Sequence, residues 1–145
     1  MGLIFDIGSN IGAFAKTWRE NGDNKVVCVE ANPALKPTLE GLFYDDKNVI
    51  IINKLVTDTT GQQTDFIISK NHVLSTARDD WTRTSRFSDR YKDSKRVKVE
   101  SITLDDLIRK YGEPNFIKID VEGHELEVLK GLTTRQQVIC FEWVE

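Results

Sequence analysis

Long apolar runs are missing from this chain of 145 residues, and their absence excludes one class of protein. No stretch approaches the roughly 20 consecutive apolar residues that a membrane-spanning helix needs. The chain also does not open with the basic segment and apolar segment that mark a secretory signal. We therefore expect a cytoplasmic protein with no membrane span.

Cysteine and net charge are also low. Cys28 and Cys140 each lie in an apolar run, without a second Cys or His at metal-ligand spacing, so we expect buried, reduced thiols and no metal site. The net charge of −3 gives no reason to expect a nucleic-acid partner. An apolar content of 39% is enough for a single core, so residues 1–145 are expected to form one domain.

Five short apolar runs predict the fold class. Most of them are continuous or nearly continuous rather than alternating, which is typical of parallel strands covered on both faces. They cover residues 2–7, 26–30, 49–53, 116–120 and 138–142. Helix-like segments follow at 11–21, 32–44, from 103, and 123–130, with Asn32 and Thr103 as N-caps. This alternation predicts an α/β fold with a mostly parallel open sheet and helices on both faces. Residues 64–69 and 96–102 look like an additional antiparallel pair.

The loop after the first run carries the first functional signal. It reads Phe5-Asp6-Ile7-Gly8-Ser9-Asn10-Ile11-Gly12 and would lie at the carboxyl end of a strand, where open α/β sheets bind ligands. Gly8 and Gly12 would let the backbone approach a ligand. Position 10 is Asn10, so the G-x-G-x-x-G of dinucleotide sites is absent. Asp6 would repel a pyrophosphate, but it suits the ammonium of the methionine part of S-adenosylmethionine (SAM).

A second carboxylate, Glu30, ends the second run, 18 residues after Gly12. A carboxylate at that point is expected to accept hydrogen bonds from both ribose hydroxyls of SAM. The adenine is expected near the end of the third run. There Leu55 or Val56 would pack on the ring, and Asp58 would accept from its amino group.

The second motif follows the fourth run. Ile119-Asp120-Val121-Glu122-Gly123 precedes Glu125-Leu126-Glu127-Val128-Leu129-Lys130-Gly131. Together with residues 5–12, Val29-Glu30-Ala31-Asn32-Pro33 and Thr103-Leu104-Asp105, this resembles the FkbM-type family of SAM-dependent methyltransferases over nearly the whole chain.

The resemblance implies a Rossmann-like class I methyltransferase fold and O-methylation of a hydroxyl on a small molecule, a sugar or a lipid-linked glycan. It also places Asp120 beside the sulfonium and Glu122 just behind it. The full set of expected cofactor-binding residues is Asp6, Gly8, Ser9, Asn10, Gly12, Glu30, Ala31, Asn32, Leu55, Asp58 and Asp120.

A hydroxyl acceptor must lose its proton, so a general base would help, and Asp120 and His124 are the candidates. Asp120 is the better placed, at the carboxyl end of a central strand. The alternative for Asp120 is that it only orients the cofactor or caps the next helix. The alternative for His124 is an ordinary surface residue. Glu125 and Glu127 are expected on the exposed face of that helix.

Residues 70–96 hold eight basic residues against four acids. They predict either a lid for an acidic or phosphorylated acceptor, with Arg83, Arg86 and Arg90 taking part, or a solvated insertion. The usual C-terminal strands are not expected after the fifth run, so its apolar edge predicts a homodimer or a truncated chain.

Two other functions stay open. One is a SAM-binding module or accessory subunit without turnover. The other is a nucleotide-dependent oxidoreductase, which Asp6 and the missing glycine motif disfavour.

Overall fold

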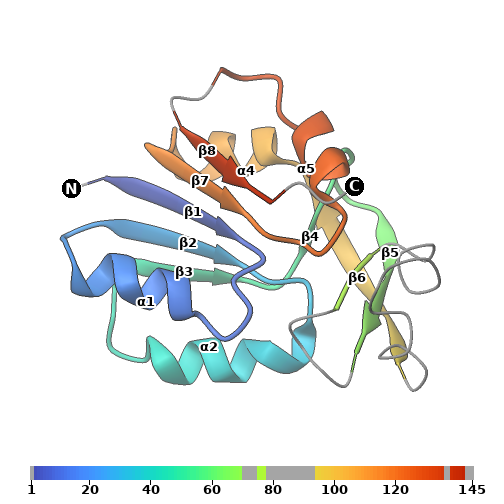
Figure 1. The fold of residues 1–145 in the computed structure, drawn as a ribbon, viewed down its shortest axis with the longest axis horizontal. Coiled ribbons are helices and arrows are strands. Elements are labelled where there is room, and N and C mark those ends of the chain that lie inside the picture. Colours follow the sequence, from blue (N-terminus) through green and yellow to red (C-terminus); the bar gives the residue numbers. More distant parts are fainter. Residues whose placement is uncertain (1, 70–74, 78–93, 136–137, 143–145) are drawn as a thin grey trace.

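The computed structural model describes residues 2–69, 75–77, 94–135 and 138–142 (Figure 1). Five strands form one sheet in the order β3-β2-β1-β7-β8, and each neighbouring pair is parallel. They are β1 (Leu3–Ile7), β2 (Lys25–Val29), β3 (Val49–Ile52), β7 (Phe116–Ile119) and β8 (Ile139–Phe141). All five apolar runs are therefore strands of the predicted parallel sheet. Strand order reverses at β1, and open α/β sheets bind ligands at such a switch point.

Helices cover both faces of this sheet, as predicted (Figure 1). α1 (Ala13–Glu20) and α2 (Lys36–Leu42) lie on one face, and α4 (Leu104–Tyr111) and α5 (Glu125–Lys130) lie on the other. Thr103 caps α4 as expected, because its hydroxyl accepts from the N–H of Asp106 at 3.1 Å.

Two expected helix boundaries are wrong. The segment from residue 32 to 44 is divided into a 3₁₀ turn, η1 (Pro33–Leu35), and α2. Asn32 is an N-cap, but it caps η1, where its Oδ1 accepts from the N–H of Ala34 at 3.0 Å. The helix expected from residue 123 begins at Glu125, because Glu122 and Gly123 have φ angles of 51° and 88°. Residues in that left-handed region cannot continue a right-handed helix.

The alternation of side chains along the strands decides which groups share a face. On β1, Phe5 and Ile7 join the core beneath α4 and α5, whereas Ile4 packs toward α1 and α2. Asp6 therefore points to the α1 side. The parallel register pairs Asp6 with Cys28 on β2 and with Lys118 on β7. A buried carboxylate and a lysine are thereby neighbours on the same face.

A second, smaller sheet stands beyond the carboxyl ends of the main strands (Figure 1). It has the order β4-β6-β5, with β4 (Leu55–Val56) parallel to β6 (Lys95–Ile102) and β5 (Gln63–Ile68) antiparallel to β6. The predicted antiparallel pair is therefore confirmed, whereas β4 was not predicted. Thr76 adds a bridge to Ile67.

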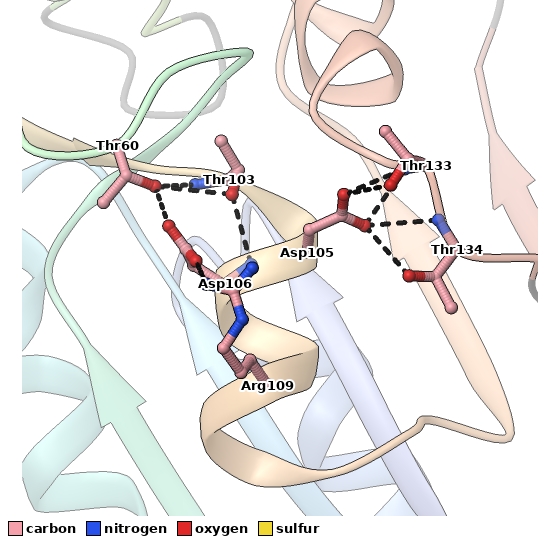
Figure 2. A network of polar contacts seen from close by, with 7 residues as sticks. All are labelled: Thr60, Thr103, Asp105, Asp106, Arg109, Thr133 and Thr134. Atoms are coloured by element: carbon pink, nitrogen blue, oxygen red, sulfur yellow. Dashed lines mark hydrogen bonds and ion pairs between the residues drawn. The ribbon is translucent and has the colours of Figure 1, made fainter.

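Two carboxylates at the start of α4 form hydrogen bonds with neighbouring segments (Figure 2). Asp105 binds the segment after α5, and Asp106 binds the connection between two strands of the second sheet. Asp105 accepts from the N–H groups of Thr133 and Thr134 at 3.0 and 3.3 Å. Asp106 accepts from the hydroxyl of Thr60, in the connection between β4 and β5. These hydrogen bonds lower the pKa of both carboxyl groups, Asp105 through Thr133 and Asp106 through Thr60. The network therefore favours the ionised forms.

The cysteine prediction is half right. Cys28 is a buried free thiol, whereas Cys140 is a free thiol that is exposed. The reason is that β8 forms the edge of the main sheet in the described part of the chain, so most of its surface is uncovered. In the same described ranges, no helix has both the length and the apolar character to cross a bilayer.

Candidate functional site

A cleft opens where β1, β2 and β7 end. The open space inside it is about 570 Å³, a figure that includes solvent at its mouth. The loops after these strands supply one wall, which includes Gly8, Asn10, Glu30, Ala31, Asp120 and Glu122. The opposite wall comes from the second sheet and its neighbours, with Lys54, Leu55, Val56, Phe66, Ser75 and Ala77.

Gly8 brings the first loop against the loop after β7. Its φ is +78°, and a Cβ at this position would overlap the carbonyl oxygen of Asp120. The N–H groups of Gly8 and Ser9 both donate to the carbonyl of Val29, at 2.9 and 3.2 Å. The Ser9 hydroxyl is buried and donates to the carbonyl of Asp6 at 2.7 Å, so Ser9 fixes the loop and is not part of the cleft lining.

Gly12 lies against α2. Its φ is +85°, and a Cβ would stand 2.9 Å from methyl carbons of both Leu39 and Leu42. The space above Gly12 is therefore filled by α2 rather than left open to the cleft, which Gly12 does not line. The glycine allows α1 to begin against α2.

Asp6 lies beneath the cleft rather than in its wall. Its side chain has no exposed surface, and Nζ of Lys118 lies 3.2 Å from its Oδ1. Neither Asp6 oxygen has a hydrogen bond of good geometry, so this contact is an ion pair without an aligned hydrogen bond. Burial raises the pKa of Asp6, and the charge of Lys118 opposes that shift. The sequence analysis expected the ammonium of SAM beside Asp6. In the structure, the cation beside Asp6 is Lys118 of the same sheet.

Glu30 is held in the cleft wall by both of its oxygens. Oε2 accepts from the N–H of Asn10 and Oε1 from the N–H of Asn32, each at 2.8 Å. Burial raises the pKa of Glu30, and these two N–H donors act against the rise. A carboxylate oxygen can accept more than one hydrogen bond, so each keeps capacity for another donor. Asn32 serves this site through its backbone, because its buried side chain caps η1.

Asn10 also faces the cleft with an unusual backbone. Its φ is 52°, and among the described residues its buried Oδ1 has no hydrogen-bond partner. Buried acceptors are nearly always paired in folded proteins. An unpaired amide oxygen in a cleft wall is a place where a ligand donor would be stabilised.

Asp120 and Glu122 supply two further carboxylates to the cleft lining. The Asp120 side chain is 45% exposed, and its Oδ2 lies 3.6 Å from Nζ of Lys118. Glu125 holds the loop between them, because its Oε1 accepts from the N–H groups of Val121 and Gly123 at 3.1 and 3.3 Å. The expectation that Glu125 lies on an exposed face is wrong, since the residue is buried against this loop.

His124 is not brought together with Asp120 in the cleft wall. Its Nε2 lies 3.2 Å from the hydroxyl of Thr57, and its Nδ1 lies 3.8 Å from a carboxylate oxygen of Glu127. The ring is buried, so the alternative of an ordinary surface histidine is wrong. Since His124 does not line the cleft, its position gives no support to the general-base hypothesis.

The residues expected near the adenine lie in different places. Leu55 and Val56 line the cleft, and Phe66 of β5 lies in the same lining. Asp58 does not, because it is exposed and its Oδ1 accepts from the hydroxyls of Thr57 and Thr59.

Several members of the site were missed by sequence reasoning. Phe66 and Ala77 of the lining have no signal of their own in the sequence. Lys118 lies in the fourth apolar run and Glu125 in the second motif, but nothing in either segment indicates the contacts that these residues make behind the lining. Their roles depend on the packing of distant segments. A partial signal existed for Ser75, which belongs to a Ser/Thr-bearing segment after β5.

Part of the predicted lid lies outside the described residues, namely 70–74 and 78–93 with Arg83, Arg86 and Arg90. Within the described ranges, no three His, Cys, Asp or Glu side chains gather as a metal site would require.

The parallel sheet, with a cleft at its switch point, defines a Rossmann-like α/β fold. The chain matches the family model described as a methyltransferase FkbM domain over residues 6–143, and it belongs to that family. This match confirms the resemblance drawn from the motifs.

One curated relative is the hexuronic acid methyltransferase AglP of Haloferax volcanii. It is 27% identical over 150 residues, which cover 99% of this chain and 55% of the relative. The chain thus spans about half the length of the curated relative it matches. No solved structure matches the chain.

Proposed function

We propose that the described residues form one SAM-binding domain that transfers a methyl group to an oxygen of a small-molecule or glycan acceptor. Membership of the FkbM methyltransferase family supports the class of reaction. The single observation that carries the cofactor assignment is Glu30, a carboxylate fixed by two backbone N–H donors at the switch point of the sheet.

We expect SAM to lie along the cleft, because the lining offers a partner for each part of the molecule. Glu30 would accept from the ribose hydroxyls, and the apolar wall of Leu55, Val56 and Phe66 would cover the adenine. Asp120 and Glu122 would face the cationic methionine end, since Asp6 is already paired inside the fold. SAM, when bound, would supply an electrophilic methyl group, because its sulfonium sulfur would leave as the neutral thioether of S-adenosylhomocysteine.

The acceptor hypothesis draws on the relative's name. A hexuronic acid carries hydroxyl groups and a carboxylate, so its oxygens present two kinds of nucleophile. A hydroxyl needs a base, and Asp120 is the candidate base that lines the cleft. A carboxylate is already ionised at neutral pH and needs none. We keep hydroxyl methylation of a small molecule, sugar or glycolipid as the proposal.

Binding and turnover can be tested separately. Thermal-shift and calorimetric titrations would compare SAM, S-adenosylhomocysteine and NAD, and we expect binding by the first two alone. A labelled-methyl transfer assay on hexuronic acids and neutral sugars then tests turnover. Binding of SAM without transfer to any acceptor would favour the accessory-module alternative. Binding of NAD alone would refute the cofactor assignment.

We also propose an oligomeric state and a cellular location. A homodimer through the edge of β8 is supported by the exposure of Val138 and Phe141, at 49% and 42%. Light scattering that gives a monomer mass at high protein concentration would contradict it. The cytoplasmic location is a prediction from the sequence alone.

A further inference from the structure

Lys118 contacts three groups that belong to two loops and one strand. Its Nζ donates to the carbonyl of Gly8 at 3.0 Å and lies 3.6 Å from Oδ2 of Asp120. The same nitrogen lies 3.2 Å from Oδ1 of Asp6. The Phe14 ring of α1 closes the remaining side, with its centroid 5.5 Å from Nζ. The side chain is only 16% exposed and is not part of the cleft lining.

Neutralising the charge of Asp6 does not by itself explain the contacts of Lys118 with Gly8 and Asp120. The approach to Asp6 lacks hydrogen-bond alignment, whereas the bond to the Gly8 carbonyl has it. Gly8 and Asp120 both line the cleft, and they come from the ends of adjacent strands, β1 and β7. An ammonium that touches both fixes the distance between the two loops.

We propose that Lys118 is a positioning residue, which sets the Gly8 turn and the Asp120 carboxylate relative to each other in the cleft. This inference rests on the proposed SAM site for its effect on ligand binding. Its structural part, the ordering of the two loops, does not depend on any ligand.

The test must separate positioning from charge balance. Lys118→Met alone leaves a buried carboxylate without a counter-ion, and such variants often fail to fold. The informative variant is therefore D6N/K118M, which removes both charges. Lys118→Arg keeps the cation. The matched control is D65N/K98M, because Asp65 and Lys98 form an ion pair at 2.8 Å on the exposed face of β5 and β6.

We expect D6N/K118M to melt within a few degrees of the wild type but to bind S-adenosylhomocysteine at least tenfold more weakly. We also expect faster amide hydrogen exchange in ligand-free protein at residues 8–12 and 119–123. Lys118→Arg should recover part of both losses, and D65N/K98M should show neither.

Wild-type affinity in D6N/K118M would overturn the proposal, as would failure of that variant to fold, since Lys118 would then serve the core. If the wild type itself binds no S-adenosylhomocysteine, the proposed function fails and the exchange experiment alone decides. Unchanged exchange in both loops would then reject a positioning role, and faster exchange would support it.

Discussion

Gly8→Ala should destabilise the protein more than the same change at any open glycine turn. The substitution meets two costs at this position. The first is the left-handed backbone, φ +78°, which costs a non-glycine residue about 1–2 kcal/mol. The second is the overlap of the new methyl with the Asp120 carbonyl. Forcing a methyl group into a filled space costs about 1–3 kcal/mol. The free energy of unfolding should therefore fall by about 2–5 kcal/mol.

Gly61→Ala is the matched control for the backbone part of that cost. Gly61 has a φ of +82°, nearly that of Gly8, and a Cβ there would meet no atom within 4 Å. Its substitution should cost only the roughly 1–2 kcal/mol of the left-handed backbone. The difference between the two variants isolates the contact between the loops after β1 and β7.

Urea denaturation followed by circular dichroism would measure both variants, and the midpoints should be compared at equal m-values. Gly8→Ala should also weaken S-adenosylhomocysteine binding, because the turn must move away from Asp120. If the two variants lose equal stability, the close approach of Gly8 to Asp120 is wrong.

Three other predictions follow from single contacts. Glu30→Gln should weaken S-adenosylhomocysteine binding by about 10–100-fold, which corresponds to the ~1.5–3 kcal/mol of a charged hydrogen bond. Glu40→Gln, at an exposed position of α2, is the control and should leave binding unchanged. Equal affinities of the two variants would count against the ribose site. Cys140 should react quickly with a thiol reagent at pH 8 and Cys28 only on unfolding, because burial raises the pKa of Cys28 to about 12; simultaneous labelling of both would contradict this. Asp105→Asn should lower the free energy of unfolding at pH 7 by about 1 kcal/mol or less. The effect is small because the hydrogen bonds of Asp105 with Thr133 and Thr134 lie near solvent. The pKa of Asp105 is lowered in the folded state, so its contribution to the free energy of unfolding is complete above the unfolded pKa of about 3.9 and is lost as the pH falls below that value. A stability difference between the wild type and the Asp105→Asn variant that stays constant from pH 7 to pH 2 would refute the assignment.

The strands and the caps could be predicted because their causes are local. Continuous apolar runs need cover on both faces, and Thr103 can cap a helix only at its first turn. Glu30 could also be placed in advance, because a strand of known direction fixes which end its last residue occupies. The position of Phe66 in the cleft wall could not be predicted. It depends on the pairing of β5 with β6, which lies more than 25 residues further along the chain.

Gly12 and His124 show a second limit. The sequence pattern around a glycine with positive φ is the same whether a ligand or a neighbouring helix fills the space above it. The difference lies in the position of Leu39, which comes from the packing of α2. His124 likewise became a buried partner of Thr57 through the approach of two distant segments.

Asp6 shows that a motif read along the chain predicts a charge but not the partner that the fold gives it. A carboxylate at the end of β1 needs a cation, and the loop motif alone offers none except a ligand. The parallel register with β7 supplies one, because it sets Lys118 directly beside Asp6 on the same face. The cation that a ligand would bring must then be met by carboxylates that still reach the cleft, and among the described lining residues these are Glu30, Asp120 and Glu122. With Glu30 held by two N–H donors at the β2 end, the cationic end of a bound ligand should point toward Asp120 and Glu122.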